Sequence, residues 1–242
     1  MRVIQVLLAL VLIGGWAVSS QAGDLVVIAS SDPTFEVGIV MDGSRSISVA
    51  ANASIVLVSS DGRTIRLSGP YNGAPDTSGS SSDSRLVDSL SRLITKKASS
   101  PTTLAVFRGG FKRAPADRPD IWGIDIARAG KYCLRPDRPA MLWWAAARSG
   151  ADVTFSSTGD SSRNAQITWP PGKRHMAWPK ALTLSDGATY VARFWSEDNG
   201  EQLVTVLMPD LDSDAHRAAW MAEHGCTRQA LKILDAMGSP SG

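Results

Sequence analysis

Short apolar runs separated by turn signals predict a β-rich unit over residues 23–71. Residues 25–28 are a continuous run of leucine, valine and isoleucine, and residues 55–58 repeat this composition. Runs of this length and composition are typical of buried strands. The pair Asp61-Gly62 follows the second run and precedes an alternating segment, and both residues tolerate positive φ. We therefore expect a β-meander that contains a hairpin at this turn.

A polar connection over residues 72–120 contains one amphipathic helix. The spacing predicts a helix over 84–97, because apolar side chains recur every three or four residues. Ser84 is a suitable N-cap, and the lysine pair at 96–97 lies in the last turn, where the helix dipole favours cations. The basic, proline-containing segment 108–120 marks the boundary to the next unit. The apolar positions are Leu86, Val87, Leu90, Leu93 and Ile94.

Residues 121–210 again read as short strands, with Gly130 expected to turn the chain between two of them. Turn signals recur at short intervals, as is typical of a small β-sandwich or barrel. Residues 189–195 and 202–207 are expected to pair as a hairpin. Together with the preceding helix, these patterns predict a second β domain after a linker.

From residue 211 to residue 242 the apolar period changes to that of helices. Asp212 or Ser213 can cap a first helix, Gly225 is suited to end it, and Thr227 can cap a second. The expected fold class is mainly β with α. Its parts are an N-terminal β-meander, a linker helix, a second small β-sandwich or barrel, and a C-terminal αα-hairpin with a short tail.

Two cysteines, Cys133 and Cys226, are the only ones in the chain. An even number in an exported chain favours a disulfide, and neither residue lies in a Cys-x-x-Cys redox motif. A free-thiol or redox role is the alternative. The bond would tie the C-terminal hairpin to the second β domain, and the chain-entropy model gives such a long loop roughly 4–5 kcal/mol.

The first 22 residues are typical of a secretory signal peptide. Arg2 precedes an apolar run over 3–13, and the sequence Ser20-Gln21-Ala22 matches a signal-peptidase site. The run is short for a membrane-spanning helix. We therefore expect cleavage before Gly23, a periplasmic location and no stable membrane span. Retention of the segment as an anchor is the alternative.

The charge composition of the chain limits which classes of partner it is expected to bind. The 242 residues contain 25 lysines and arginines against 23 acidic residues, which gives a net charge of +2. Such a balance offers no general attraction to nucleic acid. The basic run 108–118 is interpreted as a solvated linker rather than a nucleic-acid site, and we expect no nucleic-acid partner.

The stretch 38–71 carries a resemblance to a known family. It has an opening strand with Gly38 and Val40, an apolar strand, the Asp61-Gly62 turn and a Leu-Ser-Gly-Pro exit at 67–70. In this order the motifs resemble the FecR-like periplasmic domain. The resemblance implies a periplasmic β unit, and the sigma-factor role of that family's sensors is not carried over. The sequence around Cys133 and Cys226 also resembles exported bacterial proteins of unassigned function.

Candidate catalytic chemistry is sparse. The histidines are His175, His216 and His224, and nearby acids such as Glu223 could support acid–base work. Their spacing matches no metal-binding template, and no serine-hydrolase or phosphate-binding motif is present. We therefore expect no metal, no cofactor and no enzymatic activity. An envelope-polymer hydrolase that uses His216 and His224 is an alternative.

Tryptophan is the residue type that suggests a binding surface. Six of the eight tryptophans fall in the second β domain. They could fill its core or stand exposed as flat platforms for sugar rings. The candidate binding surface consists of Trp143, Trp144, Trp169 and Trp178.

These features predict a non-catalytic periplasmic binding or scaffold protein. Its expected partner is another envelope protein, met through the edge of the N-terminal sheet or through the tryptophan-rich domain. A glycan-binding module is the alternative within the binding class.

Overall fold

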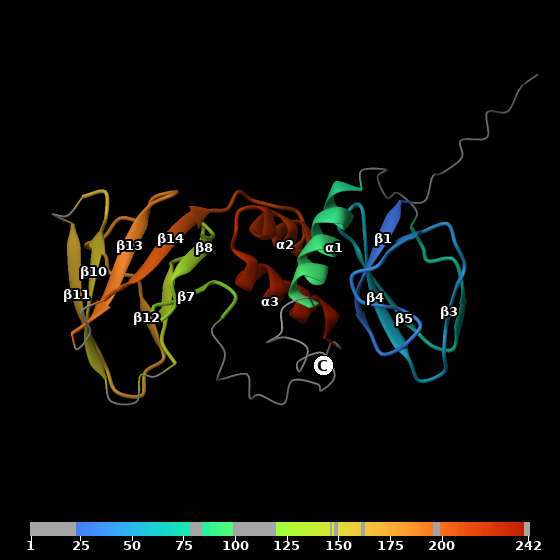
Figure 1. Ribbon diagram of the computed structural model, residues 1–242, viewed down its shortest axis with the longest axis horizontal. Coiled ribbons are helices and arrows are strands. Elements are labelled where there is room, and N and C mark those ends of the chain that lie inside the picture. Colours follow the sequence, from blue (N-terminus) through green and yellow to red (C-terminus); the bar gives the residue numbers. More distant parts are fainter. Residues whose placement is uncertain are drawn as a thin grey trace, which may run out of the picture.

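A computed structural model describes residues 23–77, 84–98, 120–145, 147, 150–160, 163–195 and 199–239. The predicted signal peptide and the basic run 108–118 lie outside these residues. The chain forms two β units with a layer of helices between them (Figure 1). The predicted class, mainly β with α, is confirmed. Within the described residues, no helix has the length and apolar character needed to cross a membrane.

The first β unit is built on a four-stranded antiparallel sheet in the order β2-β1-β4-β5. The predicted hairpin connects β4 to β5, and Gly62 adopts a φ of 81° in its turn. A short second sheet, formed by β3 and β6, packs against it. The strands are β1 (Asp24–Ser30), β2 (Val40–Asp42), β3 (Ile47–Val49), β4 (Ser54–Ser59), β5 (Thr64–Ser68) and β6 (Tyr71–Gly73).

Both faces of the four-stranded sheet are covered, which explains the continuous apolar runs of β1 and β4. Leu25 and Leu57 belong to the cluster shared with β3 and β6. Val26 and Val58 belong to a larger cluster shared with the helices. The unit therefore has three layers, with the sheet in the middle.

The helices form one layer on this sheet: α1 (Arg85–Ala98), α2 (Asp214–Glu223) and α3 (Thr227–Gly238). The predicted helix after residue 84 is confirmed, but it packs into the core beside the C-terminal hairpin and does not act as a bare linker. Ser213 caps α2, as predicted. The N-cap of α3 is Cys226, one residue before the predicted Thr227.

The second β unit is an open sandwich of a five-stranded sheet and a three-stranded sheet. The orders are β11-β10-β13-β14-β8 and β12-β9-β7. The hairpin of β13 and β14 is confirmed. Gly130, the expected turn residue, is instead the first residue of β8, and β7 and β8 lie in different sheets. The strands are β7 (Gly123–Asp125), β8 (Gly130–Leu134), β9 (Met141–Trp143), β10 (Ala151–Ser157), β11 (Asn164–Trp169), β12 (His175–Ala177), β13 (Thr189–Phe194) and β14 (Glu201–Leu207).

Helix α3 closes the free edge of β8. The predicted disulfide between Cys133 and Cys226 joins the strand to the start of the helix. Gln229, 3% exposed, accepts a hydrogen bond from Cys133 N at 2.7 Å and donates to Cys133 O and Ile121 O at 2.9 Å. A side-chain amide therefore takes the place of a neighbouring strand, which protects an edge that would otherwise be open.

Candidate functional site

The structure separates the three histidines. His175 lies on β12 of the sandwich, whereas His216 and His224 lie on α2. The ring of His224 stacks on Trp220 with a centroid distance of 3.7 Å. Across the described residues, no group of three His, Cys, Asp or Glu side chains could hold a metal ion.

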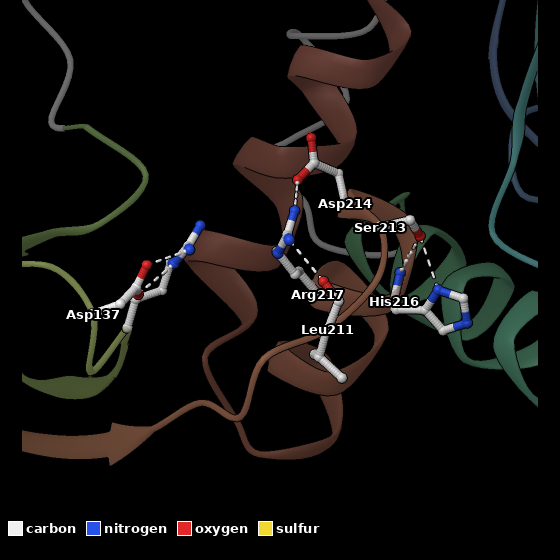
Figure 2. Close-up of polar contacts among 7 residues, drawn as sticks. Asp137, Leu211, Ser213, Asp214, His216 and Arg217 are labelled. Atoms are coloured by element: carbon white, nitrogen blue, oxygen red, sulfur yellow. Dashed lines mark hydrogen bonds and ion pairs between the residues drawn. The ribbon is translucent and has the colours of Figure 1, made fainter.

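Ser213 and His216 form a contact between a hydroxyl group and an imidazole that the sequence analysis did not predict. Ser213 Oγ lies 2.8 Å from His216 Nδ1 (Figure 2). The same oxygen accepts from His216 N at 3.3 Å, which is an N-cap contact. A Cβ added to Gly62 would lie 2.5 Å from Ser213 Oγ, so the β4–β5 turn covers the pair. The geometry is that of a helix cap against which a hairpin packs.

A groove lies where the sandwich meets α2. Its volume is about 240 Å³. Arg135 forms a forked ion pair with Asp137, and this hydrogen bond lowers the pKa of the Asp137 carboxyl. Arg217 donates to Asp214 and to Leu211 O at 2.8 and 2.7 Å (Figure 2). Each guanidinium group in the groove is already paired with a carboxylate of this chain. We therefore interpret the groove as a structural contact between the sandwich and α2. The lining residues are Arg135, Pro136, Asp137, Met208, Pro209, Asp210 and Arg217.

The predicted tryptophan surface is wrong, because the sandwich encloses most of it. Trp143, Trp169 and Trp178 are buried. Trp144 is half-buried and packs edge-on against Trp169. The indole N–H groups of Trp169 and Trp178 donate to the backbone oxygens of Lys173 and Leu182. These rings fill the core, which was the other interpretation of the tryptophan pattern.

Among the tryptophans that the structure describes, Trp195 is the exposed one, with 84% of its surface accessible. It directly follows β13, in which Ala192 and Phe194 are buried and Arg193 is exposed. Continuing this alternation by one residue directs Trp195 outward. A strict period-two analysis of the sequence could have identified it.

The edge of the first sheet carries a second exposed apolar site. Ile39 and Val40 are 49% and 37% exposed, at the start of β2. In the described chain β2 pairs with β1 alone and is an end strand of its sheet. Helix α1 fixes its position, since Ser91 Oγ donates to Gly38 O at 2.6 Å.

Charged side chains at the junction of α3 and the sandwich have shifted pKa values. Burial raises the pKa of Asp125 and lowers the pKa of Lys232. Burial also raises the pKa of Tyr132 to about 12. Arg228 donates to Tyr132 Oη at 3.1 Å and to Ala129 O at 3.0 Å. The contacts of Arg228 add to those of Gln229 in covering the edge of β8 with α3, so we assign these charged residues a structural role.

Comparisons with family models, with curated proteins and with solved structures found no match. The FecR-like resemblance of residues 38–71 therefore stays a prediction that the sequence motifs alone carry.

Proposed function

We propose that this chain is a non-catalytic periplasmic scaffold that binds another envelope protein through the open edge of its first sheet. The observation that carries the proposal is the exposure of Val40, the first residue of the end strand β2, and of Ile39, which directly precedes it. Apolar, β-branched residues on an end strand are suited to receive an added strand. The partner is accordingly an extended segment of a second exported protein.

Three further features support this proposal. The disulfide suits a protein that matures in an oxidising compartment. The edge strand lies within the segment that resembles a periplasmic domain. The hydrogen bond from Ser91 to Gly38 holds the strand in place before any partner arrives, which lowers the entropic cost of binding.

Site-specific photo-crosslinking in cells tests the proposal. A photoreactive residue at Val40 should give one adduct of reproducible mass, and the same residue at Asn72, exposed on β6, should not give it. Ile39→Lys should abolish the adduct, because a charge replaces apolar contact area. Identical adducts at both positions, or none at Val40, would refute the proposed edge.

The compartment is tested separately by mass spectrometry of the intact protein. We expect a periplasmic product that begins at Gly23 and carries oxidised cysteines. A cytosolic product that begins at Met1 with both thiols reduced would contradict the periplasmic assignment.

A further inference from the structure

The five-stranded sheet of the sandwich has one face that its core does not use. Along β10, Val153 and Phe155 are buried in the sandwich core. The residues between them alternate to the opposite side of the sheet. The same alternation on β11 and β13, continued by one residue beyond β13, defines an outer face. Its part nearest to Trp195 consists of Asp152, Thr154, Gln166, Thr168, Arg193 and Trp195.

Strand register arranges these six side chains in two rows. Asp152 pairs with Thr168, and Trp195 N donates to Asp152 O at 3.1 Å, so Thr168, Asp152 and Trp195 lie side by side. The neighbouring row contains Gln166, Thr154 and Arg193. With strands spaced about 4.8 Å apart, each row is roughly 10 Å long.

The first row is ordered before any ligand binds. Thr168 Oγ1 donates to Asp152 Oδ1 at 2.7 Å, which orients the carboxylate. Trp195 ends the row with an indole that is 84% exposed, in contrast to the neighbouring Phe194 at 8%. A large apolar ring in water contributes little to folding, and such rings are over-represented among residues that dominate binding.

We propose that this outer face binds an uncharged glycan chain. A sugar ring has an apolar C–H face and a rim of hydroxyl groups, so it needs one flat apolar surface beside several hydrogen-bonding groups in the same plane. Trp195 supplies the surface. The carboxylate, hydroxyl, amide and guanidinium groups of the two rows supply acceptors and donors for hydroxyl groups.

Charge and composition favour a glycan over other ligands. Asp152 and Arg193 offset each other, so the face offers no net attraction for a polyanion such as nucleic acid. Protein interfaces bury a core that is enriched in several aromatic and apolar side chains, whereas this face has one ring among polar groups. The site lies in the sandwich, which Figure 1 shows at the opposite end of the molecule from the first β unit. That unit contains β2, so the site goes beyond the proposed scaffold function.

Co-sedimentation with insoluble polysaccharides tests this inference. The oxidised mature protein is mixed with three uncharged insoluble polysaccharides, chitin, cellulose and mannan, in turn. We expect it to pellet with at least one of them, and Trp195→Ala to raise the dissociation constant about tenfold or more. Trp195→Phe should keep part of the affinity. Ser48→Ala, an exposed polar change on β3 of the first β unit, is the matched control and should bind as the parent does.

Other outcomes would overturn the inference. The inference is wrong if the protein stays in solution with all three polysaccharides. It is also wrong if Trp195→Ala binds as tightly as the parent. A dimer seen by sedimentation velocity and dispersed by Trp195→Ala would show that the ring meets a second copy instead. Ile39→Lys should leave glycan binding unchanged, so failure here is distinct from failure of the proposed protein contact.

Discussion

Gln229 shows how much a single buried amide contributes to this molecule. Its side chain pairs with both backbone polar groups of Cys133 and with Ile121 O. Gln229→Leu would leave these groups buried without partners, and we expect a loss of roughly 2–4 kcal/mol in the free energy of unfolding. Urea denaturation measures the change.

Gln202→Leu is the matched control, because Gln202 is exposed. We expect it to change stability by no more than about 0.5 kcal/mol. Equal losses in the two variants would contradict the role assigned to Gln229.

Tyr132 gives the junction of α3 and the sandwich a measurable pH dependence. Burial of the phenol raises its pKa from 10.0 to about 12 in the folded protein. The folded state therefore keeps a proton that the unfolded chain releases. Stability from this group is complete below pH 10 and is lost as the pH rises from 10 towards 12.

A phenolate absorbance titration checks this expectation. The difference between the parent and Tyr132→Phe should contain a transition near pH 12. A difference curve centred near pH 10 would show that the phenol is solvated in the folded protein.

At the scale of elements, Ser213 connects a helix to a hairpin. Ser213→Ala removes the acceptor for His216 N, and we expect a loss of about 1 kcal/mol. Ser213→Asp keeps an acceptor at the N-cap and should largely retain stability, as thermal unfolding would show. Esterase activity that disappears in both variants would instead support the hydrolase alternative.

Elements defined by local contacts could be predicted from the sequence. The hairpin at Gly62, the helix after Ser84 and the cap at Ser213 depend on neighbours in the chain. The parallel pairing of β8 with β14 joins segments far apart in sequence, and no local pattern encodes it. The packing of α1 against the first sheet, α2 and α3 could not be predicted, because the local sequence does not show which apolar surface covers the apolar face of a helix.

The candidate site was predicted less well than the fold. Tryptophan content indicates neither burial nor exposure, and three of the four chosen rings lie in the core. Strand alternation does carry that information, and it identifies Trp195. The edge of the first sheet was predicted as a contact surface, but its exposed residues Ile39 and Val40 emerged only from the sheet order.

At the scale of the whole molecule, α3 belongs to both β units. Its apolar residues share a core with the first sheet, and its first turn is bonded to β8. Tryptophan fluorescence reports on the sandwich and α2, because residues 23–98 contain no tryptophan. Far-ultraviolet circular dichroism reports on all three helices. Fluorescence is therefore weighted towards the sandwich, and dichroism towards the helical layer that packs on the first sheet.

In the oxidised protein we expect both signals to change in one transition, because the disulfide couples the units. Cys133→Ala with Cys226→Ala removes that bond without leaving a lone thiol, at a cost of about 4–5 kcal/mol in the chain-entropy model. Coupling then rests on Gln229 and the surrounding polar contacts, so the fluorescence and dichroism transitions in urea should separate. Transitions that still coincide in the double variant would show that apolar contacts of α3 are enough to couple the two units.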